Sequence, residues 1–259
     1  MDATGNVGET AVSPTSHTKI KEVNMKIGII NAINSLTSQV NWQGTPVQAY
    51  IRFLESGGAP FTYVGYNAAL REFPESVDAC DAYIITGSPN GVYDKEPWIA
   101  ELMQFLRDAY AAGKKLVGIC FGHQILAHAL GGHTEKSDKG WGLGLKQFNV
   151  ITKKPWMSVE AGQYALYFAH QDQVIELPPD AELLGGNGFC PNAMFVIKDQ
   201  VLGVQGHPEF TKSMMQDILA GKNGNTSPEL LNLAEESLQN GEPDNNLFTQ
   251  WIVNFLMAE

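Results

Sequence analysis

Residues 114–124 read KKLVGICFGHQ, and this stretch decides the fold. Its apolar run, residues 116–119, is typical of a strand buried on both faces of a parallel sheet. Residues 121–130 then carry apolar side chains at helical spacing. Cys120 therefore lies at a sharp turn between a strand and a helix, and the glycines two positions before and after it let the two backbones approach each other.

The position of Cys120 suits a nucleophile. Ligands of open parallel sheets bind at the carboxyl ends of the strands, and the partial positive charge of a helix N-terminus favours a thiolate. The pattern G-x-C-x-G is that of a nucleophile elbow with sulfur in place of oxygen. The alternative is a buried structural cysteine, so a catalytic reading also requires a base elsewhere in the chain.

Residues 201–210, VLGVQGHPEF, supply a candidate base. Two residues of extended backbone place His207 and Glu209 on the same side of the chain. Glu209 can then accept a hydrogen bond from one ring nitrogen while the other nitrogen faces the thiol, as in a catalytic triad. We predict Cys120 as nucleophile, His207 as base and Glu209 as its orienting residue; a second pair with the same spacing, His170 and Asp172, is a weaker alternative.

Strands and helices alternate along the chain. The patterns predict strands at 26–31, 61–66 and 81–87, and helices at 46–58 and 96–113. This βαβ alternation predicts an α/β fold with a doubly wound, mostly parallel central sheet flanked by helices.

The two ends and the middle of the chain differ from this alternating pattern. Residues 145–209 are rich in strand signals, which predicts antiparallel strands added to the sheet. Residues 1–24 are predicted to be a disordered tail because they are rich in glycine, serine and threonine. Residues 25–259 are expected to form a single domain, with a C-terminal helical extension at 213–259.

Bulk composition excludes several classes of function. A net charge of −11 and an isoelectric point near 5.0 argue against nucleic-acid binding. The three cysteines are far apart, without zinc-site or disulfide-framework spacing, which fits a reducing compartment. The chain has no apolar stretch of membrane-spanning length and no signal-peptide core. We therefore expect a cytoplasmic protein without a metal, an organic cofactor, or a nucleic-acid or membrane partner.

Together, GICFGHQ and GVQGHPE resemble the class I glutamine amidotransferases, which have a flavodoxin-like fold and a cysteine–histidine–glutamate triad. The segments IITGSPNGVYD (84–94), KGWGLGL (139–145) and YFAHQDQV (167–174) fit the same family in the same order. The resemblance implies that the backbone N–H groups of Gly87 and Phe121 bind the oxyanion. It also implies four residues that border the substrate: Gln124, His170, Gln171 and Asp172.

Two departures from the family pattern affect the shape of the pocket. Ala169 stands where the family often has serine, and WGLG replaces the more usual Trp-acidic-x-Gly. Both leave the triad intact, so they concern the substrate and not the chemistry. Specificity is expected to lie in walls near Trp42, Tyr93, Trp141 and Gln171.

A looser likeness, in GHPEFTKSMMQDIL and EPDNNLFTQWIVNFL, is to the stand-alone γ-glutamyl peptidases. The resemblances imply hydrolysis of a γ-glutamyl amide bond, in glutamine or in a γ-glutamyl peptide such as glutathione or its conjugates, through a glutamyl-thioester. The first alternative is a glutaminase subunit that delivers ammonia to a separate synthetase. The others are an α/β-hydrolase acting on esters or lactones and a catalytically silent binding or regulatory relative.

Overall fold

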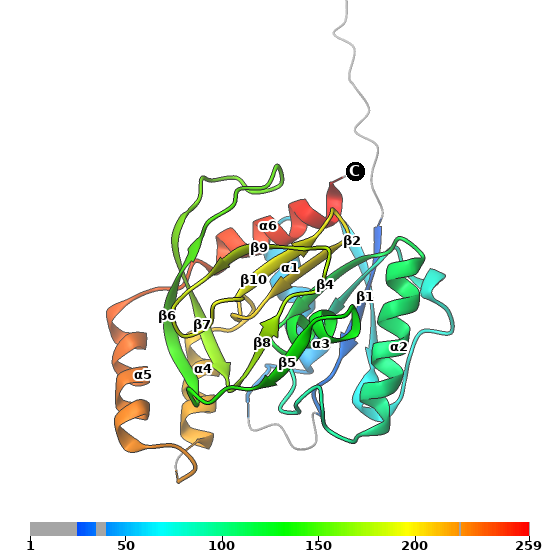
Figure 1. Ribbon diagram of the computed structural model, residues 1–259. Helices are drawn as coiled ribbons and strands as arrows, with labels where there is room; N and C mark the ends of the chain where they lie inside the picture. Colours follow the sequence, from blue (N-terminus) through cyan, green and yellow to red (C-terminus); the bar gives the residue numbers. More distant parts are fainter. Residues whose placement is uncertain (1–24, 35–39, 223, 259) are drawn as a thin grey trace, which may run out of the picture.

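The computed structural model describes residues 25–34, 40–222 and 224–258, so the predicted N-terminal tail lies outside the described residues. A nine-stranded sheet forms the centre of the molecule, with strand order β2-β1-β3-β4-β11-β10-β9-β6-β7 (Figure 1). Its strands are β1 (Met25–Asn31), β2 (Phe61–Asn67), β3 (Ala82–Ile85), β4 (Lys115–Ile119), β6 (Gly142–Val150), β7 (Gly162–His170), β9 (Ala181–Gly186), β10 (Met194–Ile197) and β11 (Val201–Val204). A separate two-stranded sheet consists of β5 (His133–Lys136) and β8 (Asp172–Glu176).

The first five strands of the large sheet, β2-β1-β3-β4-β11, are all parallel. In chain order this is 2-1-3-4-5, the arrangement of flavodoxin-like sheets. The remaining four strands continue the sheet with antiparallel pairing. The predicted doubly wound α/β fold with an added antiparallel region is confirmed.

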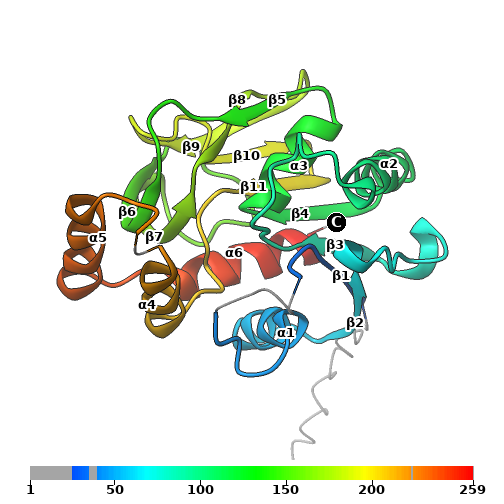
Figure 2. The ribbon, with the colours of Figure 1, turned by 90° about the horizontal axis from the view of Figure 1, so that it is seen from below.

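Helices cover both faces of the parallel part of the sheet (Figure 2). They are α1 (Pro46–Ser56) and α6 (Asn245–Met257) on one face and α2 (Pro97–Ala111) and α3 (Phe121–Ala129) on the other, whereas α4 (Lys212–Gly221) and α5 (Pro228–Asn240) lie beside the antiparallel strands β6 and β7. Alternate residues of a strand face opposite layers: Ile84 of β3 packs in the cluster of α1 and α6, whereas Tyr83 and Ile85 pack with α2 and α3. Burial on both faces explains why these strands are continuous apolar runs.

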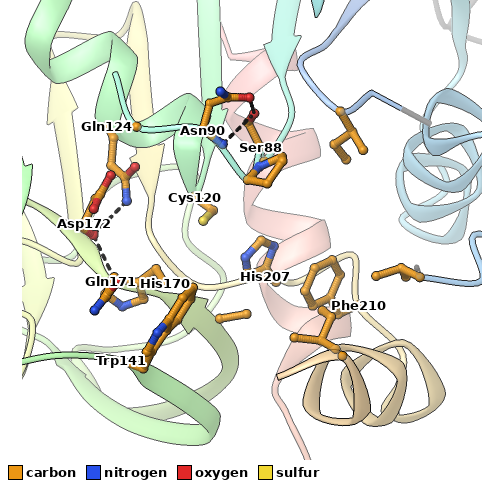
Figure 3. Close-up of a pocket in the computed structure, with 18 of the residues that line it drawn as sticks. Ser88, Asn90, Cys120, Gln124, Trp141, His170, Gln171, Asp172, His207 and Phe210 are labelled. Carbon is orange, nitrogen blue, oxygen red and sulfur yellow. Dashed lines mark hydrogen bonds between the residues drawn. The ribbon is translucent and has the colours of Figure 1, made fainter. Parts of the chain in front are cut away.

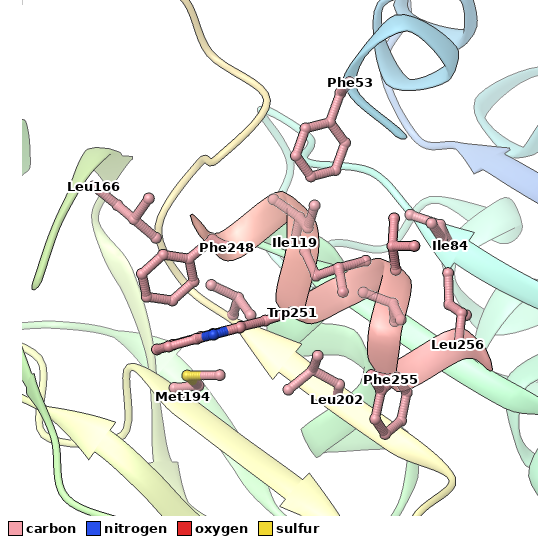
Figure 4. Close-up of a cluster of buried hydrophobic side chains, with 14 of the residues drawn as sticks. Phe53, Ile84, Ile119, Leu166, Met194, Leu202, Phe248, Trp251, Phe255 and Leu256 are labelled. Carbon is pink, nitrogen blue, oxygen red and sulfur yellow. The ribbon is translucent and has the colours of Figure 1, made fainter. Parts of the chain in front are cut away.

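The last helix, α6, lies in the core (Figure 4). Trp251 and Phe255 are fully buried there, and Phe248 packs against Trp251 with ring centroids 4.7 Å apart. The predicted C-terminal extension thus divides into two parts. Its final helix completes one face of the sheet, and α4 and α5 form a separate apolar cluster with residues of β6 and β7.

The carboxyl ends of three neighbouring parallel strands create the site. Strand β4 pairs with β3 on one side and β11 on the other, and all three run in the same direction. The turns that follow them carry Gly87, Cys120 and His207. Residues far apart in the sequence are therefore brought together at one edge of the sheet, as expected for this topology. Among the described residues, no helix combines the length and apolarity that crossing a membrane requires.

Candidate active site

Cys120 is held on a strained turn between β4 and α3. Its backbone has φ 54° and ψ −105°, a conformation that costs a non-glycine residue about 1–3 kcal/mol. A Cβ added to Gly118 would lie 2.2 Å from the Gly122 carbonyl oxygen, and one added to Gly122 would lie 2.2 Å from the Ile85 carbonyl oxygen. The predicted role of the two glycines is thus visible as backbone contact, which fixes the sulfur at the sheet edge.

His207 and Glu209 form a buried pair next to Cys120. The His207 Nδ1 atom lies 2.8 Å from Oε1 of Glu209, and both side chains are at least nine-tenths buried. The His207 backbone N–H donates to the Tyr167 carbonyl at 2.8 Å, which keeps this stretch extended. Its Nε2 is buried and has no hydrogen-bond partner among the described residues. Figure 3 shows the imidazole beside the Cys120 sulfur.

The loop that contains Gly87 touches both groups. A Cβ built on Gly87 would lie 3.2 Å from Cε1 of His207 and 3.8 Å from Cβ of Cys120. The three predicted triad residues and this loop therefore share one small volume. That arrangement allows proton exchange between imidazole and thiol beside a bound carbonyl group.

Electrostatics favour a protonated His207. Burial opposes the charged imidazole, but the Glu209 carboxylate and the Cys120 sulfur outweigh it and raise the pKa of His207 to about 10. At neutral pH the imidazole therefore carries a proton.

Tyr50 joins the triad to the loop after β3. Its hydroxyl donates to Oε1 of Glu209 at 2.9 Å and accepts from the Gly87 N–H at 3.2 Å. Burial, with the nearby Glu209 charge, raises the pKa of Tyr50, so the hydroxyl stays neutral and can donate. Sequence reasoning missed this residue, because a tyrosine on the buried face of α1 has the pattern of ordinary core packing.

The two predicted oxyanion donors differ in their surroundings. Phe121 is the first residue of α3, and the first N–H groups of a helix lack intrahelical acceptors. The Gly87 N–H, by contrast, already donates to Tyr50. The prediction of Gly87 as an oxyanion donor therefore requires that this hydrogen bond be exchanged for one to the substrate.

Gln124 and His170 each form hydrogen bonds to other residues of the protein. The Gln124 side-chain amide donates to the Asp172 carbonyl at 2.8 Å and to Oε1 of Gln205 at 3.0 Å. Only its oxygen remains for the predicted substrate contact. Nδ1 of His170 lies 2.9 Å from the Asp172 backbone carbonyl, and burial lowers the pKa of His170 to about 4.

The alternative base pair is not formed. The Asp172 carboxylate accepts from the Tyr93 hydroxyl at 2.9 Å and makes no hydrogen bond with His170. The lowered pKa keeps His170 neutral at physiological pH, and within the described part of the chain it has no carboxylate partner, in contrast to His207. The equal spacing of the two histidine–acid pairs therefore leads to different structures.

A pocket of about 580 Å³ opens over Cys120. Its lining includes every predicted site residue except Phe121, the residue after the nucleophile, and all four predicted wall residues. Sequence reasoning did not single out several other lining residues: Ser88, Asn90, Lys136, Phe210, Asp217 and Lys222. Phe210 stacks on His207 with ring centroids 3.9 Å apart. Among the described residues, no group of three or more His, Cys, Asp or Glu side chains could hold a metal ion.

Comparison with known proteins places this geometry in a family. The family model of class-I glutamine amidotransferases matches residues 42–222. Gamma-glutamyl peptidase 5 of Arabidopsis thaliana is 31% identical over 198 residues, 71% of this chain and 77% of that protein. A putative glutamine amidotransferase-like protein of Schizosaccharomyces pombe is 29% identical over 89% of this chain and 98% of its own length. The crystal structure of a glutamine amidotransferase from Thermotoga maritima has a TM-score of 0.70, 16% identity, and coverage of 91% and 99% of the two chains.

Proposed function

The chain belongs to the class I glutamine amidotransferase family, and on this premise we propose that it hydrolyses γ-glutamyl amide bonds through a glutamyl-thioester on Cys120. The observation that carries the proposal is the buried chain from Tyr50 through Glu209 to His207, whose free Nε2 lies beside a cysteine on a strained elbow. A purely structural cysteine needs neither a paired imidazole nor backbone strain.

The proposed reaction has two halves. The Cys120 sulfur, which has given its proton to His207, attacks the side-chain amide carbon, and the carbonyl oxygen takes up the electron pair near the Phe121 N–H. The C–N bond then breaks, and His207 gives its proton to the departing amine. In the second half His207 removes a proton from water, which attacks the thioester and releases glutamate from the sulfur.

Two features favour a γ-glutamyl peptide over free glutamine as substrate. Relatives at 30–31% identity are named gamma-glutamyl peptidases. The pocket of about 580 Å³ lies within the usual range for sites that bind drug-sized molecules, which are larger than glutamine. A glutaminase that passes ammonia to a separate synthetase is the second candidate, because the family name and the triad geometry apply to it equally.

Glutamate release tests the proposal. The full chain is incubated separately with glutathione and with glutamine, and free glutamate is measured over time. Cys120→Ala is the inactive variant, and Cys80→Ala, which removes a buried thiol outside the pocket, is its matched control. We expect the wild type and Cys80→Ala to release glutamate from glutathione faster than from glutamine, and Cys120→Ala to release none.

Each other result has a definite meaning. Preference for glutamine would support the glutaminase instead. Equal release by wild type and Cys120→Ala would refute the proposed chemistry and would favour a non-catalytic role for this fold.

A further inference from the structure

The wall of the pocket carries a lysine that has no acidic partner among the residues that the structure describes. Lys222 caps the end of α4, and its Nζ lies 3.6 Å from the centroid of the Trp141 ring. Both residues line the same pocket as Cys120, and Figure 3 shows the Trp141 indole on its wall. Contact with an indole face stabilises an ammonium group and fixes its position, but it does not neutralise the charge.

The carboxylates of the pocket have hydrogen-bond partners within the protein. Each of the pocket's four carboxylates accepts a hydrogen bond from the protein; they belong to Asp94, Asp172, Glu209 and Asp217. The second lysine, Lys136, lies close enough to Asp172 to counteract part of the rise that burial causes in the pKa of that carboxyl group. Lys222 forms no ion pair with any carboxylate in the part of the chain that the structure describes.

The surroundings of Lys222 favour an anionic ligand. The side chain is half-buried, and burial lowers its pKa, with no carboxylate of the described residues opposing the shift. A cation kept partly out of water without a counter-charge is costly, and a ligand carboxylate would supply that charge. The net charge of −11 makes an unpaired lysine inside a pocket more notable, since acidic side chains are abundant.

We propose that Lys222, seated on Trp141, forms a subsite that binds a carboxylate of the substrate. The inference rests on the proposed function, because that function supplies the substrate class. A γ-glutamyl peptide offers two such groups: the α-carboxylate of the glutamyl part and the C-terminal carboxylate of the leaving peptide. Recognition of the second group would distinguish a peptide substrate from glutamine.

Steady-state kinetics with three substrates identify which carboxylate binds. The substrates are glutathione, glutathione amidated at its C-terminal carboxylate, and glutamine. The variants are Lys222→Met, which keeps the stem on the indole, and Lys222→Arg, which keeps the charge. Lys212→Met makes the same change on the same helix outside the pocket and is the matched control.

We expect Lys222→Met to raise KM for glutathione about tenfold with kcat unchanged, as for loss of a charge-assisted contact. Lys222→Arg should restore most of the affinity, and Lys212→Met should resemble the wild type. An effect confined to glutathione assigns the peptide carboxylate, whereas equal effects on all three substrates assign the glutamyl α-carboxylate. Unchanged KM values for all three would overturn the subsite.

Binding to an inactive protein separates this inference from the proposed reaction. Calorimetric titration of glutathione into Cys120→Ala, with and without Lys222→Met, measures the subsite without turnover. About tenfold weaker binding after Lys222→Met supports the subsite even if the wild type releases no glutamate. Equal binding by the two proteins overturns it, even if the wild type is an active hydrolase. If Lys222 only capped the helix, Lys222→Met would lower the free energy of unfolding and leave the affinity for glutathione the same with and without the substitution.

Discussion

Removal of the Tyr50 hydroxyl tests how the active site is held together. Tyr50→Phe keeps the buried ring and deletes one oxygen, which donates to Glu209 at 2.9 Å and accepts from the Gly87 N–H at 3.2 Å. The change leaves Cys120, His207 and the pocket walls in place. Any loss of rate therefore reports on the connection between the triad and the loop after β3.

The structure sets the size of the expected effect. A hydrogen bond to a charged group contributes about 1.5–3 kcal/mol, and a buried donor without a partner costs about 1–3 kcal/mol. In Tyr50→Phe, the Glu209 carboxylate, which is the charged group, loses a hydrogen bond, and the Gly87 N–H becomes a buried donor without a partner. We expect the free energy of unfolding to fall by about 2.5–6 kcal/mol. We also expect kcat to fall about 10- to 100-fold, because Glu209 no longer holds His207 as firmly in line with the sulfur.

The assay combines urea unfolding with steady-state kinetics on the fully folded fraction. Tyr63→Phe is the matched control, since its buried hydroxyl has no hydrogen-bond partner among the described residues. It should leave kcat unchanged and alter stability by less than about 1 kcal/mol. KM of Tyr50→Phe should stay close to the wild-type value, because Tyr50 does not line the pocket. A kcat within twofold of wild type, or a stability equal to that of Tyr63→Phe, would refute the reasoning.

Three further changes have defined outcomes. In urea titrations, the free energy of unfolding of Cys120→Gly should be about 1–2 kcal/mol higher than that of Cys120→Ala, because glycine adopts φ 54° without strain. Equal free energies of unfolding would contradict this. Gly118→Ala should prevent folding, as judged by circular dichroism, because the added Cβ would lie 2.2 Å from the Gly122 carbonyl oxygen. The control Gly113→Ala should fold, with a loss of about 1 kcal/mol in stability, because no atom lies within 4 Å of its added Cβ. Burial, with a smaller effect of a neighbouring histidine, lowers the pKa of His123 to about 3, so the unfolded chain binds a proton that the folded chain excludes as pH falls from about 6.5 towards 3. In that window, the free energy of unfolding of His123→Leu should therefore decrease less steeply with falling pH than that of the wild type, by about 1.4 kcal/mol per pH unit. An equal dependence on pH in the two proteins would show that His123 does not titrate this way.

The fold was largely predictable from local patterns. Uninterrupted apolar runs indicate strands buried on both faces, and β3 and β4 show this burial. The spacing around Cys120 predicts the elbow because a Cβ at Gly118 or Gly122 would lie 2.2 Å from a backbone carbonyl oxygen, so only glycine fits at these two positions. The His207–Glu209 pair was predictable because extended backbone places alternate residues on one side.

Other parts of the site were not predictable from one chain. The same spacing at His170 and Asp172 does not produce a histidine–carboxylate pair, because the Asp172 carboxylate accepts a hydrogen bond from Tyr93 in a distant loop instead. Tyr50 reaches Glu209 from 159 positions away, and such contacts leave no local pattern. Lys222 is part of the pocket only because α4 lies beside it.

Capture of the acyl-enzyme tests the central claim most directly. Wild-type protein is mixed with excess glutathione, quenched with acid within the first turnovers, digested and analysed by mass spectrometry. We predict a γ-glutamyl group on the peptide that contains Cys120 and on no other cysteine peptide, and its absence from His207→Ala, which lacks the imidazole that exchanges protons with the sulfur. A γ-glutamyl group on Cys80 or Cys190 instead, or glutamate release without any acylated cysteine, would contradict the account.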